Sequence, residues 1–574
     1  MQNVTLTIDG RQVTVPAGTT VLEAAKQLGI DIPTLCYLPK INEIGACRVC
    51  VVEIEGARNL EPSCIYKVRE GMVVKTNSPR ARAARKINTE LILSDHAHDC
   101  LVCDRNNNCE LQSLAARLGI REYRFEGAKN NIPIDNSSES IFRDPSKCIN
   151  CRRCIAVCAQ IQGVHALGAA DRGFESAIVP AQHKPLADIS CVNCGQCTLV
   201  CPTGALTEVN HVTRVSRALA NPNKHVVVQT APATRVALGE EFGFEPGANV
   251  KGRMVAALRQ LGFDAVFDTD FTADLTIMEE GTELIDRLTN GGVLPMITSC
   301  SPGWIKFIEH NFPTMLPNLS TCKSPQQMFG ALAKTYYPES QGIDPKEIYS
   351  VSIMPCTAKK FEITRPGMDS SGYQDVDAVL TTRELAKLIK SAGIDLATLA
   401  DEEYDAPLGI STGAGLIFGA TGGVMEAALR TAYEIITGET LAKLDFEMLR
   451  GVEGVKRASI QIGDLTVNVA VAHSLAKARE LMEKIQSGEI DDLHFIEIMA
   501  CPGGCIGGGG QPRSKDPDVI EKRIAGIYTG DKEMKLRKSH ENPAVQELYE
   551  KWLGKPNGHK SHELLHTHYV ERER

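Results

Sequence analysis

Cysteine is the residue type that offers this chain most of its chemistry. The 574 residues include 20 cysteines, and most of them stand in C-x2-C groups. Thiolates at this spacing bind iron–sulfur clusters or zinc, whereas small secreted domains use their cysteines for disulfides. A chain of this length can bury apolar cores without such support, so we expect metal centres in a reducing compartment.

The first cysteine group is suited to a 2Fe-2S cluster. Cys36, Cys47, Cys50 and Cys64 are spaced C-x10-C-x2-C-x13-C. Two thiolates therefore come from one tight loop and two from flanking segments, which is enough to hold a 2Fe-2S cluster. A structural zinc site is the alternative for the same ligands.

The second group has three cysteines and needs a fourth ligand, which histidine can supply. The set is His96-x3-Cys100-x2-Cys103-x5-Cys109, with His98 as the competing histidine and zinc as the alternative metal. It resembles the 4Fe-4S site with one histidine and three cysteines that iron-only hydrogenases share with the large iron–sulfur subunit of the respiratory NADH dehydrogenase. The resemblance implies a 4Fe-4S cluster here.

Two further runs repeat the spacing C-x2-C-x2-C-x3-C, beginning at Cys148 and at Cys191. This is the signature of the bacterial two-cluster ferredoxin, in which the fourth cysteine of each run ligates the other cluster. The crossed assignment predicts two 4Fe-4S clusters. Their ligands would be Cys148, Cys151, Cys154 and Cys201 for one, and Cys191, Cys194, Cys197 and Cys158 for the other.

Four of the last five cysteines lie in dense motifs, and the fifth, Cys322, is expected to be a small buried side chain. The motifs are residues 298–304 (TSCSPGW), 354–362 (MPCTAKKFE) and 497–509 (EIMACPGGCIGGG). In this order they resemble the three signatures of iron-only hydrogenases, and the resemblance covers essentially the whole chain. It implies an enzyme that interconverts protons, electrons and H2, with electrons relayed through the N-terminal clusters.

The resemblance also implies an H-cluster, which is a 4Fe-4S cubane joined to a two-iron unit carrying CO, cyanide and a dithiolate. Cys505 would bridge the two parts, and Cys356 and Cys501 would ligate the cubane. Lys359 would donate a hydrogen bond to a cyanide, with a solvated lysine as the alternative. The glycines of the last motif would let backbone approach the cofactor. Further contacts are expected from Ala231, Pro232, Ser324, Gln326, Met354, Phe418, Gly419 and Met499.

The first motif departs from the family pattern. The family usually has adjacent cysteines there, the first delivering protons and the second ligating the cubane, whereas here Cys300 is followed by Ser301. Counting back from Cys356 places Cys300 in the proton position and Ser301 in the ligand position. A thiolate is the better iron ligand, so a local shift that makes Cys300 the ligand is the alternative.

A proton route is expected along residues 270–283. Glu280 and Glu283 are three apart and share a face if this stretch is helical, although acidic helix faces are usually just solvated. The family's path of Glu, Ser and Glu implies Glu280, Ser320 and Glu283 as proton carriers. Arg287, one turn beyond Glu283, is expected to hold the outer carboxylate.

Several domains must position these groups. Alternating residues 4–15 predict a β-hairpin and residues 20–28 a helix, a context that resembles a plant-type ferredoxin domain, although the cysteine spacing is wider. Strand-like runs at 225–228 and 349–354 alternate with amphipathic helices. The predicted fold class is a multidomain α+β and α/β chain, with ferredoxin-like iron–sulfur domains before a large α/β catalytic domain. The expected domains are 1–78 (2Fe-2S), 79–120 (histidine and three cysteines), 121–210 (two 4Fe-4S clusters) and 211–574 (H-cluster).

Charge and composition limit the partners. The net charge of -9 leaves no basic footprint for nucleic acid, and with no signal peptide and no long apolar run we expect a cytoplasmic protein without a membrane partner. No flavin or nicotinamide site is visible, so electrons would come from ferredoxin or from NADH-oxidising flavoprotein and small iron–sulfur subunits. Maturation proteins would supply the two-iron unit.

Two other functions fit parts of this sequence. An electron-transfer subunit of an NADH- or formate-oxidising complex would explain only the first half of the chain. An iron–sulfur assembly factor built on the same domain usually lacks the motifs at 354–362 and 497–509 in full, and both are intact here.

Overall fold

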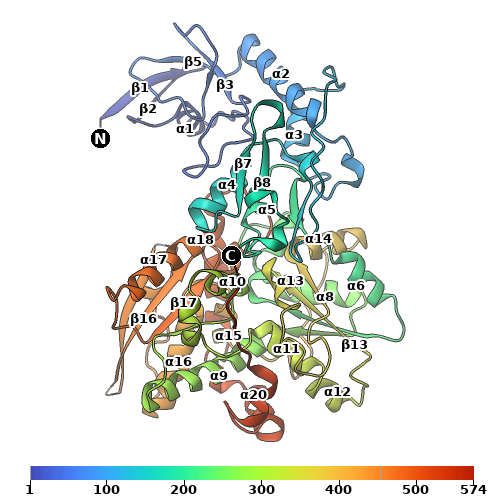
Figure 1. Cartoon of the computed structure of the whole chain (residues 1–574), viewed down its shortest axis with the longest axis vertical. Coiled ribbons are helices and arrows are strands. Elements are labelled where there is room, and N and C mark those ends of the chain that lie inside the picture. The colour runs from blue at the N-terminus through green and yellow to red at the C-terminus, as the bar shows by residue number, and fades with distance from the viewer. Residues whose placement is uncertain (1, 453, 464, 574) are drawn as a thin grey trace.

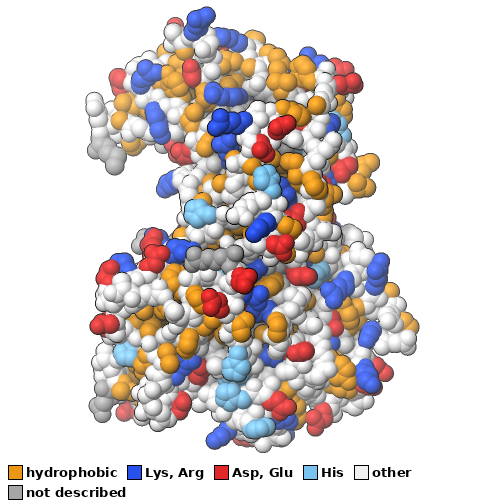
Figure 2. Space-filling view, viewed as in Figure 1, with side chains coloured by type: hydrophobic (Ala, Val, Ile, Leu, Met, Phe, Trp, Pro, Cys, Tyr) orange, Lys and Arg blue, Asp and Glu red, His pale blue; other side chains and the backbone are white. Residues whose placement is uncertain are grey.

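Figure 1 shows the computed structural model, which describes residues 2–452, 454–463 and 465–573. The N-terminal residues form an upper lobe, a narrower middle section follows, and the C-terminal part forms a large lower lobe (Figure 1). The same waist is visible in the space-filling view (Figure 2). The architecture is therefore the predicted one, with small α+β domains in front of a large α/β domain.

A five-stranded sheet and one helix build the N-terminal domain, with strand order β2-β1-β5-β3-β4. β1 and β2 pair antiparallel across the turn at Asp9 and Gly10, which confirms the predicted hairpin. The predicted helix begins after Thr20, whose hydroxyl accepts from the Glu23 N–H while the Glu23 carboxylate accepts from the Thr20 N–H. The elements are β1 (Asn3–Ile8), β2 (Arg11–Pro16), α1 (Val21–Gln27), β3 (Val51–Ile54), β4 (Glu61–Pro62) and β5 (Val73–Lys75).

Two helices frame the histidine-containing group, α2 (Pro79–Asp95) and α3 (Glu110–Arg117). The Arg85 guanidinium on α2 is buried and donates to the carbonyl oxygens of Val51 at 2.8 Å and Thr76 at 2.7 Å. These charge-assisted bonds hold α2 against the N-terminal sheet. The loop between α2 and α3 carries the predicted ligands.

The middle section contains two short antiparallel strand pairs and two short helices. Each helix begins inside one of the repeated cysteine runs, after a residue with a left-handed backbone, Arg152 (φ 62) or Gly195 (φ 68). The elements are β6 (Ile141–Arg143) with β9 (Leu206–Glu208), β7 (Leu167–Ala170) with β8 (Ala177–Pro180), α4 (Arg153–Ala156) and α5 (Gln196–Val200).

Two four-stranded sheets form the lower lobe. One has the order β11-β10-β13-β14 and is parallel throughout; the other has the order β12-β17-β16-β15, with β15 antiparallel at its edge. The strands are β10 (His225–Thr230), β11 (Ala265–Asp268), β12 (Met296–Ile297), β13 (Ile348–Met354), β14 (Ala378–Thr381), β15 (Val455–Ile462), β16 (Leu465–His473) and β17 (Phe495–Met499).

Helix α9 (Thr269–Asn290) lies between the two sheets. Its residues Phe271 and Leu275 pack in the core beside the first sheet, and Ala273 and Ile277 pack in the core beside the second. The helix predicted over residues 270–283 is therefore present and buried on two sides. Such a helix can hold acidic side chains in an apolar interior, which a surface helix cannot.

The C-terminal segment packs against the lower lobe. Helix α20 (His559–Leu565) is followed by an isolated antiparallel bridge between Cys322 and His566. His566 is 8% exposed, because the bridge holds it in the interior. Cys322 is fully buried, as predicted. Among the described residues, no helix has the length and apolar character needed to cross a membrane.

Candidate active site and electron relay

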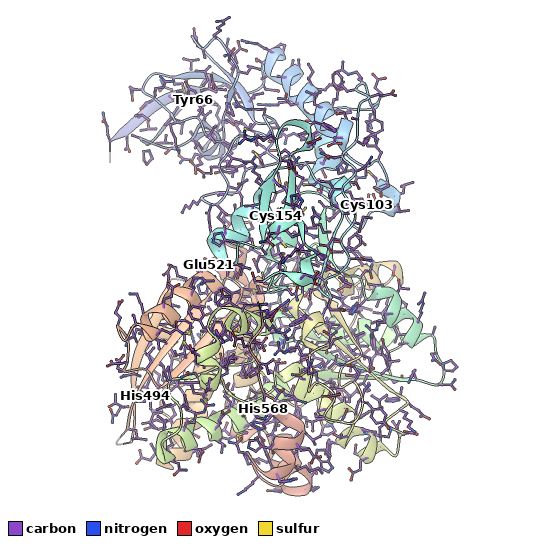
Figure 3. All side chains as sticks on the ribbon, viewed as in Figure 1. Tyr66, Cys103, Cys154, His494, Glu521 and His568 are labelled. Atoms are coloured by element: carbon purple, nitrogen blue, oxygen red, sulfur yellow. The ribbon has the colours of Figure 1, made fainter. Side chains whose placement is uncertain are left out.

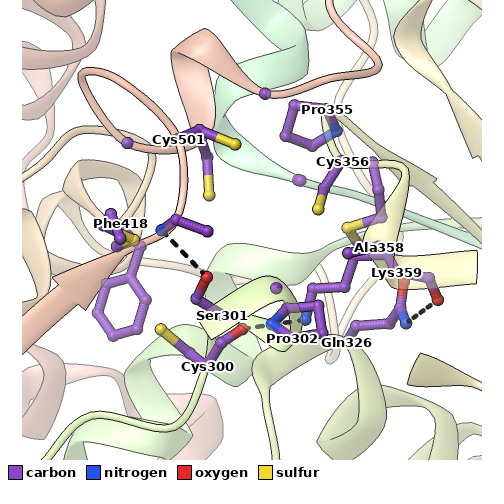
Figure 4. Close-up of a pocket in the computed structure, with 18 of the residues that line it drawn as sticks. Cys300, Ser301, Pro302, Gln326, Pro355, Cys356, Ala358, Lys359, Phe418 and Cys501 are labelled. Atoms are coloured by element: carbon purple, nitrogen blue, oxygen red, sulfur yellow. Dashed lines mark hydrogen bonds between the residues drawn. The ribbon is translucent and has the colours of Figure 1, made fainter. Parts of the chain in front are cut away.

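The three hydrogenase-like motifs meet in one cavity because each follows the carboxyl end of a parallel strand. Residues 298–304 follow β12, residues 354–362 begin at the last residue of β13, and residues 497–509 begin in the last three residues of β17. Open α/β sheets place their sites at these strand ends. The cavity is lined by Cys300, Ser301, Cys356, Cys501 and Cys505 together with mainly apolar side chains (Figure 4).

Three of the cavity thiols lie near one another. Burial raises the pKa of Cys356, Cys501 and Cys505, to about 12 for Cys505, and the charge of Cys356 raises the pKa of the other two further. Thiolates gathered in an apolar pocket are costly unless a cation compensates them, and iron is such a cation. In Figure 4 the thiols of Cys356 and Cys501 point into the same space. The donor set therefore fits the predicted iron–sulfur cofactor.

Cys300 and Ser301 face different surroundings. The Ser301 hydroxyl accepts a hydrogen bond from the Ala500 N–H at 3.3 Å, beside the Cys501 motif (Figure 4). Burial raises the pKa of the Cys300 thiol, and the charge of Glu280 raises it further. Cys300 thus lies towards the predicted proton route and Ser301 towards the cubane motif.

Lys359 belongs to a buried polar cluster beside the cavity and is not solvated. Its ammonium donates to the Glu362 carboxylate at 2.9 and 3.1 Å and to the Cys300 carbonyl oxygen at 3.2 Å. Ser324 and Gln326 donate to the same carboxylate at 2.9 and 3.0 Å. Glu362 stands in the second motif, but sequence spacing did not predict it as a site residue. Its partners Ser324 and Gln326 come from another part of the sequence, and Lys359 lies one helical turn away.

Six of the eight predicted cofactor contacts line the cavity, namely Ala231, Pro232, Gln326, Met354, Phe418 and Met499. Ser324 donates to the Glu362 carboxylate, as Gln326 does. Gly419 packs instead on Ala233 and Ile527, where a Cβ would come within 3.0 Å of the Ile527 Cδ1 atom. Ser324 and Gly419 are therefore not part of the cavity lining.

The glycines of the last motif have a role in protein packing. A Cβ on Gly508 would lie 2.2 Å from the Pro355 carbonyl oxygen, and one on Gly509 would lie 2.3 Å from that of Cys194. Both distances are far below van der Waals contact, so only glycine fits. Through Gly509, the catalytic motif lies directly against the second cysteine run of the middle section.

The predicted proton carriers lie together, with Glu280 and Ser320 buried and Glu283 half-buried. The Ser320 hydroxyl donates to Oε2 of Glu283 at 2.8 Å, and Ser320 also lowers the pKa of Glu280. Burial, followed by the charge of Glu283, outweighs this effect and raises the Glu280 pKa to about 8. Arg287 donates to Oε1 of Glu283 at 2.6 Å, as predicted. The structure thus brings Glu280, Ser320 and Glu283 together from α9 and a loop.

Two cavities in the middle section each collect four thiols across the repeated runs. Cys148, Cys151, Cys154 and Cys201 line one, and Cys158, Cys191, Cys194 and Cys197 line the other. The grouping is the crossed one. The two sets lie between the upper lobe and the catalytic domain, where Figure 3 labels Cys154.

The four thiols of the first group also lie together. A hydrogen bond from Cys36 lowers the pKa of Cys47 to about 6, and one from Cys64 lowers that of Cys50. The charges of Cys36, Cys47 and Cys50 all act on Cys64. A compact set of two thiol pairs fits a 2Fe-2S cluster.

The two histidines of the second group differ in their partners. Nδ1 of His96 is buried without a hydrogen-bond partner, whereas Nε2 of His98 lies 2.9 Å from the Leu93 carbonyl oxygen and its ring stacks on Tyr123. Burial lowers the pKa of His96 to about 4, which keeps the imidazole neutral and able to bind a metal. The geometry favours His96 over His98 as a ligand.

Single side chains connect one thiol group to another. The Asn42 amide donates to the carbonyl oxygens of Cys36 at 2.8 Å and Cys151 at 2.9 Å, and Arg105 donates to that of Cys201 at 2.7 Å. Buried hydrogen bonds of this kind hold neighbouring groups at set separations. A chain of thiol groups that ends in a thiol-lined cavity defines an iron–sulfur oxidoreductase.

Five family models match consecutive parts of the chain. The iron only hydrogenase large subunit, C-terminal domain, matches residues 224–509, and the iron hydrogenase small subunit matches 517–572. A 2Fe-2S iron-sulfur cluster binding domain matches 1–79, and the NADH-ubiquinone oxidoreductase-G iron-sulfur binding region matches 85–124. The ferredoxin-like domain of NADH-quinone oxidoreductase subunit 3 matches 138–207.

Relatives match over nearly the full length. The chain is 56% identical to the NADP-reducing hydrogenase subunit HndD of Solidesulfovibrio fructosivorans, covering 100% of both chains, and 42% identical to iron hydrogenase 1 of Clostridium pasteurianum, covering 98% of this chain and 99% of that one. A solved structure of the [FeFe]-hydrogenase HydA1 from Chlamydomonas reinhardtii matches 64% of this chain and 100% of its own with a TM-score of 0.58 and 46% identity. The chain belongs to the iron-only hydrogenase family and is an oxidoreductase that acts on H2, with N-terminal iron–sulfur domains that relay electrons.

Proposed function

We propose that protons reach the active site of this hydrogenase along Cys300, Glu280, Ser320 and Glu283. The observation that carries the proposal is the Ser320 hydroxyl, which donates to Glu283 at 2.8 Å and also lowers the pKa of Glu280. A hydroxyl accepts and donates at once, so it can pass a proton between two carboxyl groups that do not touch. Cys300, near Glu280, is the inner member of the row.

The ligand set proposed for the H-cluster is Cys356, Cys501, Cys505 and Ser301. When bound, this cofactor supplies the iron chemistry that forms and splits H2. The protein holds the site dry, since apolar side chains make up most of the lining, and Lys359 offers a buried cation held by Glu362 at its edge. A cation there suits an anionic cyanide.

The proposed relay holds one 2Fe-2S cluster in domain 1–78, one 4Fe-4S cluster in domain 79–120 and two 4Fe-4S clusters in domain 121–210, in front of the H-cluster domain 211–574. Its ligands are Cys36, Cys47, Cys50 and Cys64 for the first cluster, His96, Cys100, Cys103 and Cys109 for the second, and the two crossed sets of the middle section for the others. The shared thiol cavities and the unpartnered Nδ1 of His96 support these assignments.

The proposed electron partners are ferredoxin or a flavoprotein that oxidises a nicotinamide, acting with small iron–sulfur subunits. The name of the relative from Solidesulfovibrio, a subunit of an NADP-reducing hydrogenase, supports the second option. We propose a cytoplasmic location, since all 20 cysteines are free thiols and a reducing compartment keeps them so.

One assay tests the function and one tests the partner. The fully matured protein should evolve H2 from a chemically reduced dye, whereas an electron-transfer subunit or an assembly factor would not. Purification of the native protein should bring flavin-bearing subunits with it. A native preparation that is free of flavin subunits and active with reduced ferredoxin would favour ferredoxin as the partner.

A further inference from the structure

Three side chains of different elements converge at the outer end of the proton row. They are Glu283 on α9, Cys322 in the loop before α11 (Pro325–Ala333), and His566 after α20. A carboxylate oxygen, a thiol sulfur and an imidazole nitrogen from the three all lie within 4.8 Å of one another. This mixed set of donors differs from the all-cysteine cavities of the relay.

Backbone pairing holds the set in place. Cys322 and His566 face each other in an antiparallel bridge, flanked by hydrogen bonds from Lys323 N to the Leu565 carbonyl oxygen and from Thr567 N to the Thr321 carbonyl oxygen, both 2.8 Å. The two donors therefore keep their separation without help from a ligand. A preformed pair of this kind lowers the ordering cost of binding.

The ring of His566 is oriented as in metal sites. Nε2 lies 3.2 Å from a carboxylate oxygen of Glu279, and Nδ1 lies 2.8 Å from the Thr321 hydroxyl, which itself is 3.4 Å from Oε2 of Glu283. Metal-binding histidines usually give their second nitrogen to a carboxylate, which here is Glu279. Nδ1 thus faces the Thr321 hydroxyl, which lies beside Glu283, and Oε2 of Glu283 is 3.9 Å from the Cys322 sulfur.

We propose that Glu283 Oε2, Cys322 Sγ and His566 Nδ1 form a binding site for Zn²⁺, and that Zn²⁺ bound there inhibits H2 turnover. One thiolate, one imidazole and one carboxylate suit zinc, and a water completes a tetrahedron. Binding breaks the S–H bond of Cys322, forms the Zn–S bond and releases the proton to solvent, with no change in oxidation state. This inference rests on the proposed proton route.

The inhibition follows from which carboxylate oxygen of Glu283 binds the metal. Oε2 is the atom of Glu283 that accepts from Ser320, whereas Oε1 is held by Arg287. A metal ion bound to Oε2 occupies the atom that accepts the hydrogen bond from Ser320, so Glu283 can no longer take the proton from Ser320. The proton then has no carrier beyond Ser320.

The two other groups of possible metal ligands among the described residues are paired with lysine or arginine, whereas at Glu283 Arg287 holds only Oε1. Glu426, Asp445 and Asp531 accept from Arg430, Arg450 and Arg537, and Glu434 is paired with Lys538. A cation has little to gain at these places.

An exposed histidine offers a route of entry. His562 stacks on His566 with ring centroids 4.2 Å apart and is itself exposed. Histidine side chains gather over α20 in the space-filling view (Figure 2), and Figure 3 labels His568 there.

The first test measures binding on the cluster-loaded holoprotein, with Zn²⁺ alone as the probe. Wild type should bind one Zn²⁺ more tightly than Cys322→Ser and His566→Gln by more than about tenfold. X-ray absorption at the zinc edge should show one sulfur at about 2.3 Å and nitrogen or oxygen ligands at about 2.0–2.1 Å. His568→Gln, which changes an exposed histidine outside the set, is the matched control and should bind like wild type.

Iron content and the carbonyl and cyanide infrared bands of the two-iron unit verify that each variant is folded and loaded. Cys322→Ala provides a second removal of the thiol in case Ser disturbs the loop. Equal Zn²⁺ affinity in wild type, both Cys322 variants and His566→Gln, or a zinc edge without sulfur, would overturn the site.

The second test measures H2 evolution against Zn²⁺. Wild type and His568→Gln should lose about tenfold or more of their rate at saturation, while Cys322→Ser and His566→Gln keep theirs at the same concentration. A zinc edge with sulfur but an unchanged rate would keep the site and instead remove Glu283 from the proton route. If Glu280→Gln loses turnover but the protein has no Zn²⁺ site, the proton route is kept and the zinc inference is overturned.

Discussion

The hydroxyl of Ser320 donates a hydrogen bond to Oε2 of Glu283 at 2.8 Å, and Ser320 is fully buried while Glu283 is half-buried. Glu280 lies on the same helix as Glu283 and is 2% exposed. These three residues are the proposed proton carriers. The first predictions concern these residues.

Glu280→Gln should abolish most H2 turnover, by about 10²-fold or more, because an amide cannot carry the proton. The carbonyl and cyanide infrared bands of the cofactor should stay close to wild type, since no ligand is touched. Asp286→Asn, an exposed change on the same helix, is the control and should keep full activity. Unchanged turnover in Glu280→Gln would remove the route from the mechanism.

The direction of turnover should depend on pH through Glu280. Burial, then the charge of Glu283, raises the Glu280 pKa to about 8, so the carboxyl is protonated below this pH and ionised above it. H2 evolution needs a donor and should fall as pH rises through about 8, while H2 oxidation needs an acceptor and should rise. Electrode currents for H2 evolution and for H2 oxidation measure these two pH dependences.

Glu283→Gln sharpens this test. Removing the neighbouring charge lowers the pKa of Glu280, so both pH dependences of the residual activity should move to lower pH. If the pH dependences of H2 evolution and H2 oxidation do not move, a group other than Glu280 determines them.

The mature protein should contain about twenty iron atoms per chain, with about two in the first cluster, four in each of the next three and six in the H-cluster. Expression without the machinery for the two-iron unit should leave about eighteen. Iron analysis is the measurement. About sixteen irons together with one zinc in the mature form would contradict a 4Fe-4S cluster at His96 and its three cysteines.

Cys300→Asp decides which residue of the first motif is the ligand. If Cys300 carries protons, a carboxylate can replace the thiol, and the variant should keep its cofactor and measurable activity. Electron paramagnetic resonance of the cubane and infrared spectroscopy of the two-iron unit are the readouts. Loss of the cubane signal and failure to accept the two-iron unit would identify Cys300 as the ligand instead.

Ser301→Cys is the matched change at the neighbouring position. With Ser301 as the fourth ligand, this variant should keep the cubane signal and hold the cluster more firmly, because thiolate is the better iron ligand. A cubane signal that is insensitive to both Ser301→Cys and Ser301→Ala would exclude Ser301 from the ligand set.

The sequence alone determined the features that depend on local spacing. A cluster takes several ligands from a loop of a few residues, so the cysteine runs, the histidine motif and the three hydrogenase motifs could be read without a fold. The hairpin and helix of the first domain followed from alternation and capping near Thr20. The family and its chemistry were therefore predictable.

Only the tertiary structure decided the features that depend on packing. Glu362 gains its role from Ser324, Gln326 and Lys359, and His566 meets Glu279 across 287 residues of sequence. Likewise, His96 rather than His98 has the unpartnered nitrogen, and Glu280 owes its raised pKa to burial between two sheets. Burial and hydrogen-bond partners are set by which elements pack together, and residue spacing along the chain carries no record of that.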